Sequence, residues 1–391
     1  MTNPIAHSRL VLTPLPPTHF GLGAIDGVAV TVRGTGSDTA IIVTDQNLAG
    51  TSLVTSVADV LAAGGIAVTV FSEVHPNPTT GDVAAGADAV AAAGGRPAVV
   101  AVGGGSPIDA AKGIVVAAVN PERGRDLDYR RTFAHPALPL VAVPTTAGTG
   151  TETNAFGVIT DPVTRRKFYV GGATARPAAA ILDPELTVGL PPAATAATGM
   201  DALVHALESG MSTRANPWSE GLARQAIRMI SAYLPRAVAD GTDLEARSQL
   251  LLASHLAGVA FASTGLGICH AIGHSLGGRF DIAHGVALTL VLPQVLRFNA
   301  PVCAERLADA AFAFGAGDRG ESAGWNAGAA IDAITGLAGA VGLTGRLPDF
   351  GVTAADFPKI CADALDDEVL VNTPRMPTAA DITAMLRAAS G

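Results

Sequence analysis

The first half of the chain alternates short apolar runs, rich in β-branched residues, with Ala-rich stretches of helical period. The apolar runs predict strands at residues 39–45, 66–71, 98–102 and 139–146. The stretches between them predict helices at residues 51–63, 80–93 and 106–119. Wholly apolar strands that alternate with helices are typical of a parallel sheet covered on both faces. A ligand of such a sheet binds at the carboxyl ends of its strands.

The pattern changes after Asp183, where the Pro-rich segment LDPELTVGLPP indicates a domain boundary. We expect an α/β domain over residues 1–186 and an all-helical domain over residues 187–391. No strand pattern follows the boundary. Ala- and Leu-rich stretches instead predict helices at residues 193–211, 217–239, 244–261, 284–298, 303–315, 324–341 and 381–389.

Composition supports a globular protein of two domains. The chain has 391 residues, of which 49% are hydrophobic and 15% charged, so it can bury a large core. Its apolar runs are much shorter than the roughly 20 residues that cross a bilayer. The N-terminal segment MTNPIAHSRLVLTPLPP lacks a basic region followed by an apolar core, so we expect no signal peptide. These features predict a cytoplasmic protein with no membrane partner.

Charge and cysteine usage bear on the partners and the cellular compartment of the protein. The net charge is −9, no basic run is present and aromatic residues make up 4% of the chain, which argues against a nucleic-acid partner. The three cysteines lie far apart and form no CxxC motif, which suits a reducing compartment.

A glycine-rich loop, GGGSPIDAAKG at Gly103–Gly113, follows the third predicted strand and opens a helix. Glycine lets the backbone approach a phosphate closely, and a helix N-terminus offers unpaired N–H groups and a positive dipole end. We expect Ser106 to cap the helix and Pro107 to lie in its first turn. The alternative is a plain tight turn. The loop is neither a Walker A motif nor a GxGxxG dinucleotide motif.

Two further features fit a nucleotide site at the same sheet edge. The polar loop PTTAGTGTETN at Pro144–Asn154 follows the fourth predicted strand, and its hydroxyl and backbone groups suit phosphate or ribose. Asp45 ends the first predicted strand, where a carboxylate can accept hydrogen bonds from a ribose and repel a 2′-phosphate. Asp45 can also be a plain helix cap.

Histidines and one carboxylate cluster in two blocks of the predicted helical domain. Asp201 and His205 are four residues apart in GMDALVHALE, as are His270 and His274 in GICHAIGHSLGG, and His284 follows. Residues four apart share one face of a helix. We expect Gly277–Gly278 to end the helix after His274. A single such histidine is usually a satisfied core residue, but together Asp201, His205, His270 and His284 predict a divalent metal site in apolar surroundings.

These segments together resemble the iron-containing (group III) alcohol dehydrogenases. The matching motifs, in the family's order from Thr44 to Ala287, are TDQNL, HPNPT, GGGSPIDAAKG, PTTAGTGTET, ILDPELT, LPPAATAATGMDALVHALE and GLGICHAIGHSLGG followed by AHGVA. The resemblance implies a Rossmann-like N-terminal α/β nucleotide-binding domain and an all-α C-terminal metal-binding domain, a fold similar to that of dehydroquinate synthase. It places the active site in a cleft between the two domains.

The resemblance also implies roles for individual residues. Asp201, His205, His270 and His284 would hold Fe²⁺ or, alternatively, Zn²⁺. His274 matches a histidine thought to assist proton transfer. The Asp at position 45 is similar to that of members which prefer NAD. The residues that match cofactor contacts are Asp45, Asn77, Gly104, Gly105, Ser106, Asp109, Thr145, Thr146, Thr149 and Lys167.

The activity that the resemblance implies is that of an NAD-dependent, iron-type alcohol dehydrogenase or aldehyde reductase (EC 1.1.1.-). Hydride would pass between the nicotinamide C4 and a small metal-bound alcohol or aldehyde. The alternatives are a reductase similar to maleylacetate reductases, which lack this full ligand set, and an NAD-dependent lyase similar to dehydroquinate synthases, whose ligands are arranged differently. Members of the family associate, so we expect a homodimer or larger homo-oligomer.

Overall fold

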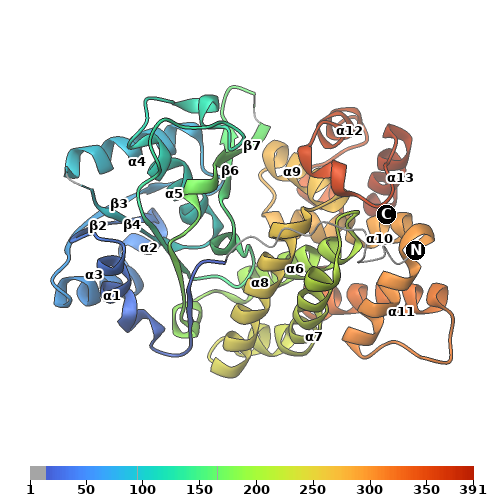
Figure 1. The fold of residues 1–391 in the computed structure, drawn as a ribbon. Helices are drawn as coiled ribbons and strands as arrows, with labels where there is room; N and C mark the ends of the chain where they lie inside the picture. The colour runs from blue at the N-terminus through green and yellow to red at the C-terminus, as the bar shows by residue number, and fades with distance from the viewer. Residues whose placement is uncertain (1–14, 95, 165) are drawn as a thin grey trace. The chain divides into compact units, whose positions relative to one another are not determined.

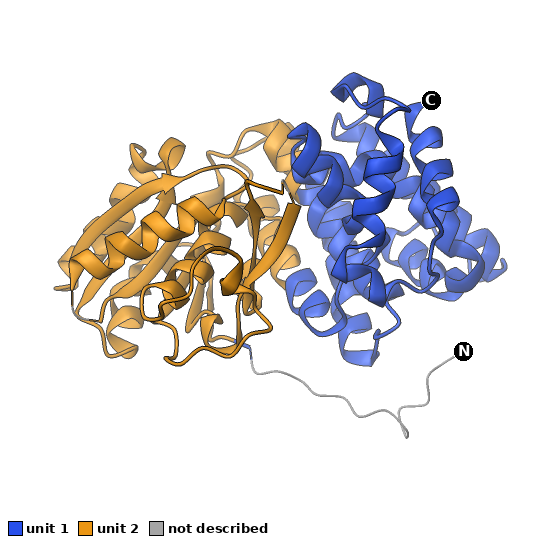
Figure 2. Ribbon diagram, turned by 90° about the horizontal axis from the view of Figure 1, so that it is seen from above, with its two compact units in different colours: residues 1–15, 199–235, 256–391 blue, residues 16–198, 236–255 orange. Residues whose placement is uncertain are grey.

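The structure is a computed structural model that describes residues 15–94, 96–164 and 166–391. The N-terminal segment MTNPIAHSRLVLTPLPP, where no signal peptide is expected, lies largely outside the described residues. One compact unit contains Pro16–Thr198 and Arg236–His255, and the other contains Gly199–Pro235 and Leu256–Gly391 (Figure 2). Residues 187–198 and 236–255 thus group with the first unit, and the domain boundary expected at residues 186 and 187 stays a prediction.

The first unit, the α/β unit, is built on a six-stranded sheet (Figure 1). Its strand order is β1-β8-β5-β4-β2-β3, and each neighbouring pair is parallel. The strands are β1 (Thr18–Phe20), β2 (Thr39–Asp45), β3 (Ala67–Val74), β4 (Ala98–Gly103), β5 (Leu140–Pro144) and β8 (Ala179–Leu182). The predicted parallel sheet is confirmed.

Helices cover both faces of this sheet because its central strands are apolar on both sides. In β4, Val99 and Ala101 pack into one core cluster, which includes side chains of α4 (Thr80–Ala93) and α5 (Gly105–Ala117). The alternate residues of β4 pack into a second cluster with α1 (Val28–Gly34) and α3 (Ser52–Ala63). The helices expected at residues 51–63, 80–93 and 106–119 are therefore present, with ends shifted by two residues or fewer.

A separate two-stranded antiparallel sheet, β6 (Phe156–Asp161) with β7 (Arg166–Gly171), was not among the sequence predictions. Its burial alternates along β6, as in a strand with one buried face. Gly157 makes the packing on α5 possible, because a Cβ atom there would lie 2.3 Å from the carbonyl oxygen of Asp109. The hairpin therefore lies directly against the helix that follows the glycine-rich loop.

The second unit, the helical unit, contains no strand among its described residues. The helices of the C-terminal half are α6 (Pro192–Met211), α7 (Pro217–Ala239), α8 (Leu244–Thr264), α9 (Ile268–Phe280), α10 (His284–Phe314), α11 (Ala323–Ala340), α12 (Phe357–Leu365) and α13 (Ala379–Ser390). Short 3-10 turns include η6 (Pro184–Thr187) and η8 (Glu368–Asn372). Helix α12 was not predicted, since its nine residues are few for a periodic pattern.

Two helix ends differ from the expectations. The helix that carries His270 does not stop at Gly277–Gly278 but runs on to Phe280 and ends at Asp281, which has a left-handed backbone (φ 54°). Glycine costs a helix only about 1 kcal/mol per residue, and the packing of α9 on α10 and α12 offsets that cost. The two helices expected at 284–298 and 303–315 are both present within α10, but they meet without a linker. The non-helical backbone of Cys303 (φ −125°, ψ 18°), two residues after Pro301, is the break between them.

Helix α10 is long and apolar enough to cross a membrane by length and composition, with a mean hydropathy of 1.4 over an 18-residue window. Half of that window is buried, and the helix packs on α9, α11 and α13. A core helix of a globular domain has the same properties, so hydropathy does not distinguish the two here.

Candidate metal and nucleotide sites

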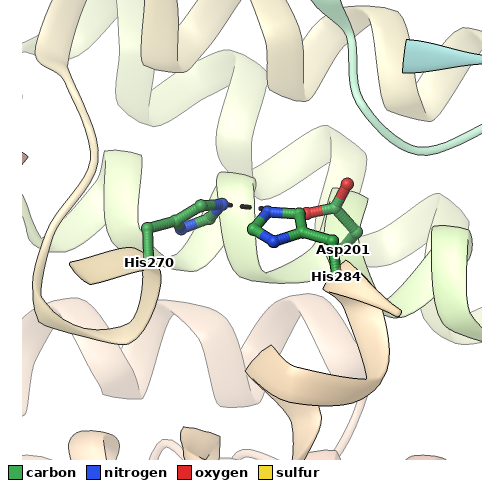
Figure 3. A group of neighbouring side chains, drawn as sticks. All are labelled: Asp201, His270 and His284. Carbon is green, nitrogen blue, oxygen red and sulfur yellow. Dashed lines mark ion pairs between the residues drawn. The ribbon is translucent and has the colours of Figure 1, made fainter. Parts of the chain in front are cut away.

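Three helix segments of the helical unit bring the predicted metal ligands together. Asp201 and His205 lie one turn apart on α6, His270 lies in the first turn of α9, and His284 is the first residue of α10. Figure 3 shows the side chains of Asp201, His270 and His284 turned toward one another. Because each residue lies on or at the start of a packed helix, the backbone fixes its position.

The ligand atoms of Asp201, His270 and His284 all lie within 4.8 Å of one another. The Nε2 atoms of His270 and His284 are each 3.7 Å from Asp201 Oδ1. His205 lies beside this group, with its Nε2 atom 3.4 Å from the same oxygen and its ring stacked on that of His270 at 4.7 Å. The geometry thus brings the three predicted histidine ligands around Asp201 Oδ1.

The residues fit a divalent cation. Asp201 Oδ1 and His270 Nε2 are buried atoms that accept or donate no hydrogen bond within the described chain. A buried polar atom without a partner costs about 1–3 kcal/mol, and a bound cation would remove that cost. One carboxylate with imidazole nitrogens is a donor set that both Fe²⁺ and Zn²⁺ accept.

The charged groups in this cluster shift one another's pKa values. Burial alone would raise the pKa of Asp201, but His205, His284 and His270 hold it well below its usual range. Burial alone would lower the pKa of His270, yet the carboxylates of Glu208 and Asp201 raise it to about 9. The imidazoles thus stabilise the anionic form of the Asp201 carboxylate. A bound cation would supply the same stabilisation in place of protons on the imidazoles.

The two polar loops of the α/β unit lie side by side, because β4 and β5 are neighbours in the sheet and both loops leave their carboxyl ends. A Cβ atom on Gly104 would lie 3.2 Å from the Thr146 methyl group, and one on Gly105 would lie 2.7 Å from the Thr149 methyl group. A side chain at Gly105 would thus displace Thr149 and one at Gly104 would crowd Thr146, so the two glycines allow the loops to approach closely. The Thr145 N–H group donates to the Gly103 carbonyl.

Helix α5 begins one residue earlier than expected. Gly105 is its first residue and Gly104 its N-cap, and no described side chain caps its first turn. Ser106 therefore lies inside the first turn and is not the cap, while Pro107 does lie in the first turn as expected. An uncapped N-terminus of a buried helix suits an anionic ligand such as a pyrophosphate.

Asp109 and Lys112 of α5 hold the polar loop Pro144–Asn154 in place through hydrogen bonds. The Asp109 carboxylate accepts hydrogen bonds from Thr151 Oγ1 (2.5 Å) and from the Val158 N–H group (3.0 Å). The Lys112 ammonium is fully buried and contacts four oxygens of residues 151–156 at 2.6–2.8 Å. Burial lowers the pKa of Lys112 to about 8, against the opposing effect of Asp109 and Glu152. Asp109 as a direct cofactor contact stays a prediction.

The remaining predicted cofactor residues are spread over the α/β unit. Asp45 Oδ1 accepts from the N–H groups of Asn47 and Leu48, so Asp45 does cap the short helix α2 (Gln46–Ala49). Its Oδ2 atom takes no part in that cap. Asn77 has a left-handed backbone (φ 53°), and Lys167 lies on β7. The ribose role of Asp45 and the contacts of Asn77 and Lys167 stay predictions.

Comparison with known proteins decides the family. The N-terminal part matches the family model "Iron-containing alcohol dehydrogenase" over residues 16–184, and the C-terminal part matches "Fe-containing alcohol dehydrogenase family, C-terminal" over residues 195–390. The chain belongs to the iron-containing alcohol dehydrogenase family. It is therefore an oxidoreductase, as the sequence predicts.

Individual relatives in this family match over nearly the whole chain. The NAD-dependent methanol dehydrogenase of Bacillus methanolicus is 37% identical over 95% of this chain and 97% of its own. The 1,3-propanediol dehydrogenase of Klebsiella pneumoniae is 40% identical over 95% of this chain and 96% of its own. A crystal structure of 1,3-propanediol oxidoreductase superposes with a TM-score of 0.94 at 39% identity, covering 97% and 100% of the two chains. The maleylacetate reductase and dehydroquinate synthase alternatives receive no support from these findings.

Glu208 is a site residue of this family member that sequence reasoning missed. Its Oε2 atom accepts a hydrogen bond from His270 Nδ1 at 2.6 Å, and its two oxygens accept from the N–H groups of Gly267 and Cys269. It thus caps α9 and also fixes which His270 nitrogen carries the proton. Glu208 lies seven residues after Asp201 on α6, and that helical spacing was the available signal.

Asp367 was missed as well. Its Oδ2 atom accepts from His274 Nδ1 at 2.7 Å, although the two residues are 93 positions apart. No local spacing connects them. His274 lies next to the cluster, with its ring stacked on that of His284 at 5.5 Å. Its role as the catalytic residue stays a prediction.

Replacing Glu208 by Gln is expected to weaken metal binding by about 10–100-fold. The amide can still accept from a backbone N–H group, but it no longer provides the charged acceptor for His270 Nδ1. Competition with a chelator measures the metal affinity. Glu305→Gln, on the exposed side of α10, is the matched control and should bind metal like the wild type. Equal affinities for wild type and Glu208→Gln would contradict the positioning role.

Proposed function

We propose that the protein is an NAD-dependent alcohol dehydrogenase and aldehyde reductase that transfers hydride between NAD(H) and a small alcohol or aldehyde. The observation that carries this is the group Asp201, His270 and His284, the first two of them buried, whose ligand atoms lie within 4.8 Å of one another. The family membership and the NAD-dependent methanol dehydrogenase among the relatives support NAD as the cosubstrate.

The proposed metal ligands are Asp201, His205, His270 and His284. When bound, a divalent ion supplies a Lewis acid that polarises an alcohol or carbonyl oxygen. One carboxylate and three neutral imidazoles leave a net charge of about +1 on that ion. The family supports Fe²⁺, and Zn²⁺ suits the same ligands.

The chain's other proposed residues bind the dinucleotide and move the proton. Gly104, Gly105 and Ser106, at the uncapped start of α5, offer N–H groups to the pyrophosphate. Thr145, Thr146 and Thr149 form the adjacent wall. His274 would take the hydroxyl proton in alcohol oxidation and return it in aldehyde reduction.

A substrate panel tests the proposal. Protein reconstituted separately with Fe²⁺ and Zn²⁺ is assayed with NAD and NADP against short alcohols, diols and their aldehydes, following absorbance of the reduced nicotinamide. Net NADH formation with a simple alcohol is the expected result. A dehydroquinate synthase-like lyase, which uses NAD without net redox change, would give none.

Replacing Asp45 by Ser is expected to shift the ratio of kcat/KM for NADP over that for NAD upward by about tenfold. Ser can retain the helix cap, whereas it removes a charge that would repel a 2′-phosphate by about 1–4 kcal/mol near the protein surface. Steady-state kinetics with both cosubstrates measure the ratio. Asp26→Ser is the matched control, since Asp26 is likewise an aspartate at the start of a short helical segment, the 3-10 turn Ala24–Gly27. An unchanged ratio would contradict a role of Asp45 in selecting NAD over NADP and would leave it only the role of a helix cap.

We further propose that the enzyme works in the cytoplasm as a homodimer or larger homo-oligomer, with neither nucleic acid nor membrane as a partner. The buried free cysteines Cys269, Cys303 and Cys361 and the net charge of −9 support this. Light scattering after gel filtration measures the oligomeric state, and a monomer at micromolar concentration would contradict it.

A further inference from the structure

Two histidines of α9 use the same ring nitrogen in the same way. His270 Nδ1 lies 2.6 Å from Glu208 Oε2, and His274 Nδ1 lies 2.7 Å from Asp367 Oδ2. An ionised carboxylate only accepts hydrogen bonds, so each Nδ1 atom carries the proton. In the neutral ring, Nε2 then carries the lone pair.

Both oxygens of the Asp367 carboxylate have hydrogen-bond partners. Its Oδ1 atom accepts from the Val369 N–H group at 3.0 Å, which makes Asp367 the N-cap of η8. At the far end of η8, the Asn372 carbonyl accepts from the Thr213 N–H group, and the Asn372 side chain packs against Gly265 just before α9. The side chains of His274 and Asp367 are 9% and 14% exposed, so water competes little for their hydrogen bond.

The His274 ring itself lies among the candidate ligands. It stacks on His284 with an interplanar angle of 12° and meets His270 edge-on at a centroid distance of 5.9 Å. Its Nδ1 atom, however, is engaged by a carboxylate that belongs to no candidate ligand group. The hydrogen-bond partner of His274 Nδ1 therefore belongs to the N-cap of η8, a segment close to the C-terminus, and not to the candidate ligands.

We propose that Asp367 is a positioning residue that holds His274 as the Nδ1–H tautomer and so presents Nε2 as the atom that exchanges the substrate proton. The proposal rests on the proposed function of His274. In alcohol oxidation the substrate hydride goes to NAD⁺ and its hydroxyl proton goes to Nε2. The Nδ1 proton stays on the ring throughout, Asp367 remains ionised, and the new proton leaves Nε2 to water.

The decisive variant is Asp367→Asn, because Asn keeps the size and the capping oxygen of Asp. Its amide, when it faces the ring, donates to Nδ1 instead of accepting from it, and so favours the Nε2–H tautomer. We expect kcat to fall by about 10²–10⁴-fold, while KM changes by less than about threefold because no substrate contact is lost.

The matched control is Asp363→Asn. Asp363 also connects the C-terminal helices to α9, where it accepts from Ser275 Oγ and from Arg279 instead of from a histidine. A general loosening of this region would lower kcat in both variants. We expect Asp363→Asn to retain the wild-type kcat within about threefold, and an equal loss in both variants would overturn the proposal.

A second readout is independent of turnover. Nitrogen-15 NMR of the histidine rings in zinc-loaded protein distinguishes the two tautomers, and the His274→Gln variant identifies the signal by its loss. We expect Nδ1–H in the wild type and Nε2–H in Asp367→Asn. The Nδ1–H form in both proteins would overturn the proposal. If the wild type oxidised no alcohol, the proposed function would fail, while the ring signals would still test the tautomer.

Discussion

Replacing His270 by Ala is expected to remove the bound metal and to lower turnover by about 10³-fold or more. The His270 Nε2 atom is buried, is 3.7 Å from Asp201 Oδ1 and has no hydrogen-bond partner in the described chain. Loss of a Lewis acid removes several kcal/mol of transition-state stabilisation, and each 1.36 kcal/mol is a factor of ten in rate. Metal content by mass spectrometry and NADH formation measure the two effects.

The control for this substitution is His135→Ala. His135 is exposed and lies in the α/β unit, so its loss should change neither metal content nor turnover. Thermal unfolding of both variants shows whether the fold is retained. A His270→Ala protein with a full complement of metal and unchanged turnover would remove the basis of the proposed metal site.

Replacing Lys112 by Met is expected to lower the free energy of unfolding by about 3–5 kcal/mol, because the buried Asp109 carboxylate loses its nearby cation. The ammonium contacts the Thr151 carbonyl (2.6 Å), Thr151 Oγ1 (2.6 Å), Asn154 Oδ1 (2.8 Å) and the Phe156 carbonyl (2.7 Å). Met fills similar volume but donates no hydrogen bond, so these oxygens remain buried without it. Urea unfolding followed by circular dichroism measures the change.

The same substitution should also weaken NAD binding, because Lys112 and Asp109 together hold the loop that carries Thr149 against α5. Lys359→Met is the control, since Lys359 is exposed on α12 and a surface substitution usually changes stability by less than about 0.5 kcal/mol. Similar unfolding midpoints for the two variants would show that the four contacts contribute little.

Much of the fold could be predicted from the sequence because a strand that is buried on both faces of a sheet has a continuous run of apolar residues. β4 is apolar throughout and β2 has an apolar centre, Ala40–Val43, and both strands were located within one residue. The hairpin β6–β7 was missed because only alternate positions of β6 are buried, which is a weak signal over six residues. The end of α9 was wrong because glycine propensity was weighed without tertiary packing, which stabilises the helix beyond Gly277–Gly278.

The candidate site was predictable as far as its residues are local. Asp201 and His205, like His270 and His274, are one helical turn apart, and the family motif includes them all. What the sequence could not show is which carboxylate lies at which ring nitrogen. Glu208 and His270 are 62 positions apart, and His274 and Asp367 are 93 apart. Such pairs are set by tertiary packing, which leaves no periodic trace.

The α/β unit is not one continuous stretch of chain, and this matters for recombination between family members. Residues 236–255 belong to it although residues 199–235 of the helical unit intervene. Within the α/β unit, buried Glu152 is paired with His255 at 2.8 Å. A chimera joined at residue 198 would take these two residues from different parents. A parent with an apolar side chain in place of His255 would leave the carboxylate without its partner, so a compatible chimera must exchange residues 236–255 together with residues 16–198.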